Sequence, residues 1–272
     1  MSGTPDNIYG YNPSPAAAII FVVLFGITTV WHIWIMIQRR AFYFVVLIIG
    51  GGLEIAGYIC RFLGHDNTGA MTLYIVQTLT ILVAPALFAA SIYMVLGRLV
   101  RLVQSEAYSP ISPSLLTKIF VGGDILSFVV QIAGSGLLTS NFNVGKAIIL
   151  VGLATQIVFF ALFVVCATIF HRRLSRVPTS TSLRLDQEHK MQWRDITRVI
   201  FIASALVFVR SIFRFVEFTG GMDSPMLKTE AYLYICDSTL MFLVLAVLVY
   251  WHPSKYIGTG VEHSRVHNEE MY

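Results

Sequence analysis

A stretch rich in arginine, from Arg210 to Glu217, lies inside the largely apolar segment Ile196–Phe218. Arg210, Arg214 and Glu217 are spaced i, i+4 and i+7, so on a helix their side chains share one face. One arginine at the centre of a bilayer costs about 2.5–3.5 kcal/mol on insertion scales. The stretch therefore predicts a polar helix face that is turned toward other helices or water rather than toward lipid.

Other apolar segments also carry ionisable and amide side chains, several of them seven residues apart. Seven residues is close to two helical turns, so the members of each pair share a face. The pairs are Glu54 with Arg61, Asp124 with Gln131, and Glu230 with Asp237. The full set of candidate ligand-binding residues is Glu54, Tyr58, Arg61, Gln77, Asp124, Gln131, Gln156, Arg210, Arg214, Glu217, Glu230 and Asp237.

The composition indicates what kind of element must position these side chains. Of the 272 residues, 56% are hydrophobic and 12% charged, and the mean hydropathy is +0.72. Soluble domains carry about 25% charged residues, so this chain has too few charges to cover a surface in water. We conclude that it is an integral membrane protein.

Seven apolar segments are long enough to cross a bilayer as helices. They are Ala16–Ile37, Phe42–Phe62, Thr72–Val100, Ile119–Leu138, Lys146–Phe170, Ile196–Phe218 and Ala231–Trp251. The third contains Pro85, which removes a backbone hydrogen bond and should kink the helix. We predict an all-α fold, a seven-helix transmembrane domain over residues 16–252, with an extracellular tail at 1–15 and a cytosolic tail at 253–272.

Basic residues are concentrated in every second connection. They flank the first span, the link between spans three and four, the link between spans five and six, and the last span, whereas Lys146 and Lys228 alone lie on the opposite side. By the positive-inside rule the N-terminus is outside and the C-terminus is cytosolic. This orientation places most of the candidate residues in the outer half of the bundle, with Asp124 nearer the cytosol.

The charges inside the spans nearly balance. Three arginines face four carboxyl groups, those of Glu54, Glu217, Glu230 and Asp237, so one carboxyl is left unpaired, protonated or available to a cationic ligand. Two interpretations remain open. The residues form either a closed network that fixes helix register or the lining of an outward-opening cavity. Intramembrane ionisable residues usually mark a pathway or site, and this favours the cavity.

These residues, in this order, resemble the fungal lipid-translocating exporter family, seven-span proteins named for resistance to a toxic aminosterol. The resemblance extends over roughly the whole membrane domain. Its motifs are Tyr11, Pro13 and Ser14; Glu54, Gly57, Tyr58 and Arg61; Gln77, Ala84, Pro85 and Tyr93; Asp124, Gln131 and Gly134; Gly152 and Gln156; Arg210, Arg214 and Glu217; Glu230 and Asp237; and His252 and Pro253.

The resemblance implies a fungal protein of the plasma membrane or a related compartment that releases sphingoid long-chain bases or sterol-like compounds and confers tolerance to toxic amphiphiles. Such a ligand has a long apolar body and a protonated amine. We hypothesise that Glu54, Glu217 or Asp237 contacts the amine, while the arginines tune these carboxylates or bind an anionic head group. Expected partners are membrane lipids and an amphipathic small molecule, with a homo-oligomer left open; we expect no nucleic acid and no cofactor.

Two other functions are considered. A seven-span lipid sensor or receptor would use the same outer cavity without moving lipid. A metal-dependent intramembrane lipid hydrolase would need ligands such as His32, His171, His252 and Asp124, which fall near the cytosolic ends of the spans. No Rossmann glycine motif, P-loop or metalloprotease helix motif occurs in the sequence, and we expect the protein not to be an enzyme.

Overall fold

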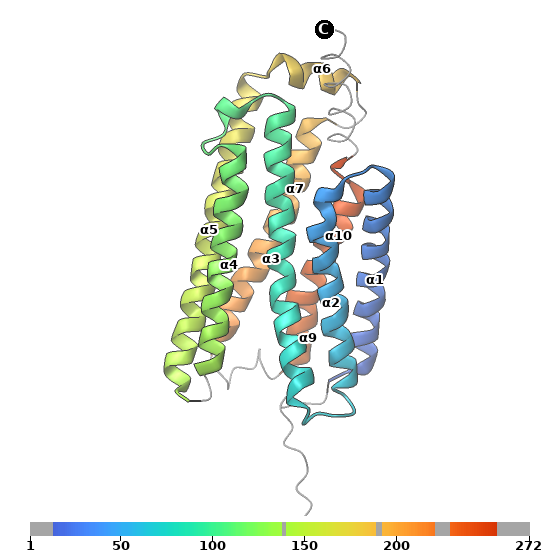
Figure 1. Cartoon of the computed structure of the whole chain (residues 1–272), viewed down its shortest axis with the longest axis vertical. Helices are drawn as coiled ribbons and strands as arrows, with labels where there is room; N and C mark the ends of the chain where they lie inside the picture. Colours follow the sequence, from blue (N-terminus) through green and yellow to red (C-terminus); the bar gives the residue numbers. More distant parts are fainter. Residues whose placement is uncertain (1–12, 138–139, 189–191, 221–228, 255–272) are drawn as a thin grey trace, which may run out of the picture.

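The computed structural model describes residues 13–137, 140–188, 192–220 and 229–254, and within these ranges the chain is helical and contains no strand. Seven helical spans, each long and apolar enough to cross a membrane, run roughly along the long axis of the molecule (Figure 1). This confirms the predicted all-α, seven-span fold. The predicted tails lie mostly outside the described residues, and the orientation in the membrane stays a prediction.

The spans follow the predicted order along the chain. They are α1 (Pro15–Gln38), η1 with α2 (Phe42–Phe44 and Val45–Leu63), α3 (Met71–Leu102), α4 (Pro113–Leu137), α5 (Phe142–Arg176), α7 (Trp193–Thr219), and α9, η3 and α10 joined end to end (Glu230–Leu233, Tyr234–Ser238 and Thr239–Tyr250). η3 is a π-helical turn inside the last span. The short helices η2 (Glu106–Tyr108) and α6 (Ser180–Glu188) lie in the connections.

The two ends of the bundle differ in what they hold. The Ser14 end, at the bottom of Figure 1, is where α1, α3, α5 and α9 begin; the Trp251 end, at the top, is where α10 ends and where α6 lies. Most of the helices are longer than the predicted apolar segments, and two of them extend furthest beyond these segments. α4 already begins at Pro113, a residue type suited to a first helical turn, and α5 continues to Arg176. Hydropathy marks the apolar part of a helix but not its charged ends.

The connection between α5 and α7 is partly folded onto the bundle. α6 begins just after Thr179, whose hydroxyl donates to the carbonyl oxygen of Val103 at the end of α3, over 2.7 Å. Thr181 donates to the side chain of Gln104 over 2.8 Å. These two bonds fix α6 against the Trp251 end. The sequence did not predict this helix.

Glycines bring α4 and α5 close together. A Cβ atom on Gly134 would lie 2.9 Å from the carbonyl oxygen of Gly145, and one on Gly152 would lie 2.9 Å from the carbonyl oxygen of Ser127. Small residues allow such backbone contact between membrane helices. The contact places Gln131 on α4 beside Gln156 on α5.

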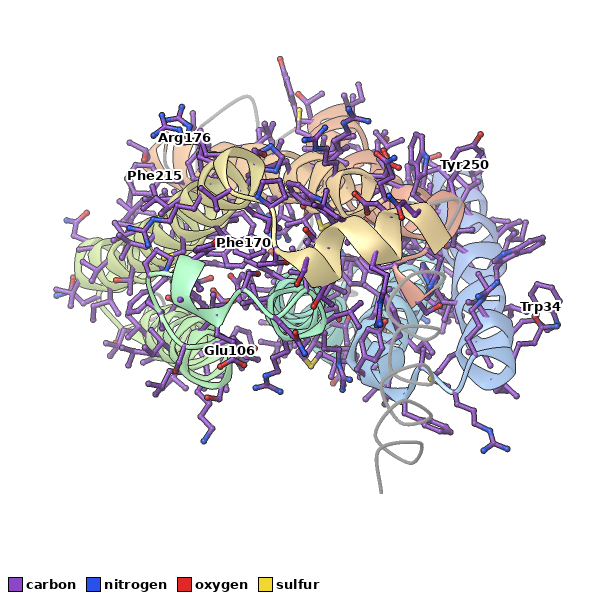
Figure 2. The ribbon with its side chains drawn as sticks, turned by 90° about the horizontal axis from the view of Figure 1, so that it is seen from above. Trp34, Glu106, Phe170, Arg176, Phe215 and Tyr250 are labelled. Atoms are coloured by element: carbon purple, nitrogen blue, oxygen red, sulfur yellow. The ribbon has the colours of Figure 1, made fainter. Side chains whose placement is uncertain are left out.

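The outer surface of the bundle is largely apolar, whereas its interior contains both apolar and charged side chains. Figure 2 shows Trp34 and Tyr250 projecting from the periphery and Phe170 lying within the bundle; the first two are 52% and 70% exposed and Phe170 is buried. A surface of this kind suits lipid rather than water. The buried side chains include aromatic rings and, unusually for an apolar chain, arginines and carboxylates.

Candidate functional site

The polar face of α7 is buried as its spacing predicts. Arg210, Arg214 and Glu217 are all at most 9% exposed, and each takes part in an ion pair. Arg214 Nη1 donates to Oε2 of Glu217, four-fifths of a turn further along α7, over 2.8 Å. Removing one partner of a buried pair leaves an uncompensated charge, at a cost of about 3–5 kcal/mol, so these side chains depend on one another.

Asp237 is the carboxylate on which both arginines converge. Arg210 Nε donates to Asp237 Oδ1, and Arg214 Nη2 lies 3.6 Å from Asp237 Oδ2. The three side chains come from two spans, α7 and η3, so the pairs join these spans inside the bundle. A negative charge shared between two guanidinium groups is better compensated than one held by a single partner.

The second donor of Arg210 reaches α3. Arg210 Nη2 donates to the carbonyl oxygen of Ile81 over 3.2 Å. In a regular helix this carbonyl would accept from the backbone N–H of the residue four positions later, which here is Pro85 and has none. Arg210 therefore satisfies the acceptor that the proline leaves open, and it joins α3 to the same network.

The π-helical turn η3 presents three side chains to the network. Single π turns widen a helix locally and are frequent at functional sites. Tyr234 accepts from Arg61 Nε over 3.0 Å, Asp237 binds the arginines of α7, and Ser238 Oγ forms a hydrogen bond with the hydroxyl of Tyr58. The turn thereby contacts α2 and α7 together.

A second cluster of charges lies at the Ser14 end. Arg61, in the last turn of α2, pairs with Glu230 at the start of α9, with 2.8 Å between Nη2 and Oε1. The same carboxylate accepts the backbone N–H of Ser14, the N-cap of α1, over 2.9 Å. Glu230 thus connects the first, second and last spans.

Glu54 is the carboxyl of the network that stays without an ion pair among the described residues. It is 1% exposed, and its Oε1 has no hydrogen-bond partner in the described part of the chain. The charges of Asp237, Arg210 and Arg214 all act on it. The sequence predicted one unpaired carboxyl, and the structure identifies which one it is.

A cavity of about 150 Å³ opens beside the network, toward the Ser14 end. Five of the predicted residues line it: Arg61, Gln77, Gln131, Arg214 and Glu217. The rest of the wall lies outside the predicted set of ligand-binding residues and consists of Tyr74, Thr78, Ile81, Leu82, Ser135, Ile149, Phe218, Thr229 and Leu233. Ser135 lies four residues after Gln131, so helical spacing alone could have found it.

The remaining predicted residues lie behind the cavity wall or away from it. Arg210, Asp237, Tyr58 and Glu54 lie deeper in the bundle, Glu230 binds Arg61, and Gln156 accepts from Gln131 over 3.3 Å. Asp124 is apart from all of them. It accepts a hydrogen bond from Tyr93 over 3.0 Å, and Tyr93 packs against Phe120, Phe160 and Phe163.

The histidines considered as metal ligands do not come together with Asp124. The rings of His32 and His252 are 5.4 Å apart at the Trp251 end, whereas His171 packs against Trp193. Among the described residues no group of three or more histidine, cysteine or acidic side chains could hold a metal ion.

The model of the RTA1 like protein family matches residues 47–260, a range that contains nearly all of the network and the cavity. The chain belongs to this family. The predicted resemblance to fungal lipid-translocating exporters is therefore confirmed, since a relative in Leptosphaeria maculans is named a lipid-translocating exporter-like protein RTA1.

Three relatives illustrate how the names within the family vary. The chain is 31% identical to protoporphyrin uptake protein 1 of Saccharomyces cerevisiae, over 88% of this chain and 89% of the relative. It is 30% identical to the probable lipid transporter atnI of Emericella nidulans (98% and 73%) and 25% identical to the sphingoid long-chain base transporter RSB1 of Saccharomyces cerevisiae (91% and 74%). No solved structure matches the chain significantly.

Proposed function

We propose that this RTA1-like protein binds the polar head groups of amphipathic lipids in the cavity at the Ser14 end and translocates these lipids out of the membrane leaflet that supplies them. The observation that supports this is the lining of the cavity, where Glu217, Arg61 and Arg214 stand beside apolar side chains such as Leu82 and Phe218. The names of two relatives, a probable lipid transporter and a sphingoid long-chain base transporter, agree with it.

The size of the cavity favours a head group over a whole lipid. Pockets that bury a drug-sized ligand measure about 300–1,000 Å³, and this one measures about 150 Å³. The apolar tail then lies outside it, against the lipid-facing side chains of the helices that form its wall. Ile75 and Leu79 on α3 and Ile132 on α4 are exposed apolar residues in these positions.

A sphingoid long-chain base or a sterol-like amine fits the chemistry of the wall. Glu217 is the carboxylate of the network that faces the cavity, so it is the residue we assign to the protonated amine. The amides of Gln77 and Gln131 supply donors and acceptors for hydroxyl groups. This refines the expectation from sequence, in which Glu54, Glu217 and Asp237 were equivalent candidates.

In this proposal the protein is a transporter of the plasma membrane, without enzymatic activity, whose export of toxic amphiphiles gives the cell tolerance to them. The test is transfer of a fluorescent long-chain base between the leaflets of liposomes that contain the purified protein. The variant Glu217→Gln keeps the size of the side chain and removes its charge.

A matched control lies on the same helix. Asp195 and Arg198 form the same type of i,i+3 pair as Arg214 and Glu217, with 2.9 Å between Arg198 Nη1 and Asp195 Oδ1, but they are far more exposed and lie at the opposite end of α7. Charge-assisted hydrogen bonds are worth about 1.5–3 kcal/mol, so Glu217→Gln should slow transfer of the amine roughly 10- to 100-fold, and Asp195→Asn should not. Transfer of a long-chain diol that lacks the amine should be the same in both variants.

Two results would count against the proposal. Wild-type protein that binds the long-chain base but moves none of it would support a lipid sensor instead. Equal transfer by wild type and Glu217→Gln would remove the assigned role of this carboxylate.

A further inference from the structure

Six charged groups of the network take part in ion pairs, and one carboxyl has no ion pair among the described residues. Arg61 pairs with Glu230, Arg210 with Asp237, and Arg214 with Glu217 and Asp237. With these six groups charged, the network is neutral. Glu54 is the seventh group, and ionising it would give the buried network a net negative charge.

Close contacts of α2 with α1 and α3 surround Glu54. Its own helix carries Gly50, Gly51 and Gly57, which face Phe88 on α3, Thr29 on α1 and Ile81 on α3, respectively. These neighbours carry no charge. The charged groups that face Glu54 are Arg210 and Arg214 from α7 and Asp237 from η3; Tyr58, one turn away on α2, is the titratable group of its own helix.

Two buried carboxylate oxygens in this region lack a hydrogen-bond donor in the described part of the chain: Oε1 of Glu54 and Oδ2 of Asp237. Two carboxylates that share a low-dielectric site do not both ionise without a large penalty, and one of them retains a proton. Asp237 has two arginine partners, so the proton belongs on Glu54.

We propose that Glu54 is a proton-binding site and that the protein exchanges this proton for the amine of its cargo. The exchange rests on the proposed function; the presence of the proton does not. When a protonated amine binds Glu217, it competes with Arg214 for that carboxylate. Arg214, which lies in the cavity wall and also acts on Glu54, is then available to compensate an ionised Glu54.

The charges in this step balance. One ammonium group enters the network and one proton leaves, as the carboxylic acid of Glu54 becomes a carboxylate. By linkage the effect is reciprocal: a bound amine favours loss of the proton, and a proton on Glu54 favours release of the amine. A proton gradient can therefore drive the cargo in one direction.

The first test detects the proton without any cargo. Infrared spectra of the purified, unliganded protein in H₂O and D₂O should show an exchange-sensitive C=O band of a protonated carboxylic acid that is absent in Glu54→Gln. Asp124→Asn is the matched control, because Asp124 is also buried and has an oxygen, Oδ1, without a partner among the described residues, but it lies outside the network. The Glu54 band should persist in this control, and Glu54→Asp should restore a band at a shifted frequency.

The second test counts protons on binding. In weakly buffered detergent solution, addition of a long-chain base should release about one proton per molecule bound by wild type and by Asp124→Asn, and none by Glu54→Gln, which should still bind. An infrared band that is unchanged in Glu54→Gln overturns the proposal, whether or not the protein transports lipid. Equal proton release by wild type and Glu54→Gln overturns the exchange. If wild type binds no long-chain base, the proposed function fails, and the infrared result still decides the proton site.

Discussion

Arg210 donates to the carbonyl oxygen of Ile81, the acceptor that Pro85 deprives of its helical hydrogen bond. The contact explains how a proline is accommodated in the middle of a membrane helix, where an open carbonyl cannot turn to water. It also fixes the guanidinium group of Arg210, which at the same time holds Asp237. Pro85 of α3 and the ionic network are thus parts of one arrangement.

This arrangement predicts strong coupling between Arg210 and Asp237. Arg210→Met should lower the free energy of unfolding by about 3–5 kcal/mol, because it removes one of the two arginine partners of a buried carboxylate. Asp237→Leu should lower the free energy of unfolding by a similar amount. The double variant should lose clearly less than the sum of the two single losses. Thermal unfolding in detergent measures this. Arg198→Met, at an exposed pair, should change stability by no more than about 1 kcal/mol; additive losses would contradict the prediction.

The close approach of α4 and α5 predicts opposite effects for two glycines. Gly152→Ala should destabilise the protein, because the added methyl group would lie 2.9 Å from the carbonyl oxygen of Ser127, which cannot move without shifting the backbone. Gly122→Ala on α4 meets nothing within 4 Å and should be neutral or stabilising by about 0.5–1 kcal/mol. Apparent melting temperatures of the two variants should move apart, and equal shifts would show that the helices do not meet in this way.

The hydrogen bond between Tyr58 and Ser238 can be tested with a matched tyrosine. Tyr58→Phe should cost about 1 kcal/mol, since Ser238 keeps its bond to the carbonyl oxygen of Leu233, 3.2 Å away. The hydroxyl of Tyr43 is buried and has no partner among the described residues, so Tyr43→Phe should be neutral or stabilising. Unfolding of the two variants under the same conditions gives the comparison. A loss in Tyr58→Phe no greater than that in Tyr43→Phe would argue against the described hydrogen bond between Tyr58 and Ser238.

Filling the cavity should impair transport without unfolding the protein. Ser135→Leu places an apolar side chain in the cavity wall, so head groups should enter less and lipid transfer should fall roughly tenfold or more, at little cost in stability. Thr155→Leu on α5 removes the same type of bond to the carbonyl oxygen four residues earlier, 2.8 Å in both cases, and lies outside the cavity wall. Its transfer rate should match wild type, and loss of transfer in both variants would point to a general effect of the lost bond.

The number of spans and the buried face of α7 could be predicted from sequence, because both depend on local patterns. Hydropathy over about 20 residues determines whether a helix can span a membrane, and the spacing of Arg210, Arg214 and Glu217 determines which way they face. The pairing of charges could not be predicted in this way, since it depends on which helices are neighbours. The π turn at Asp237 and the role of Pro85 belong to the same class of tertiary effects.

Asp124 shows what the seven-residue spacing does not determine. It shares a helix face with Gln131, as expected, but seven residues also separate the two by about 10 Å along the axis. Gln131 lines the cavity, whereas Asp124 lies in a different layer beside Tyr93. Glu54 and Arg61 are related in the same way on α2. Spacing in the sequence determines which helix face a residue lies on. It does not determine which residues of other helices lie at the same depth in the bundle.

The pair between Arg61 and Glu230 has a consequence for how the chain is made. The two residues are 169 positions apart, so at about 5–20 residues per second a ribosome needs roughly 10–30 s to supply the partner of Arg61. Arg210 and Asp237 are 27 positions apart, a delay of roughly 1–5 s at the same speed. Arg61 is in the last turn of α2, where a long side chain can reach water at the membrane surface before its partner has been synthesised. Arg210 lies further from a helix end, so its side chain cannot reach water in this way. The arginine that lies further from a helix end is also the one whose partner is synthesised sooner.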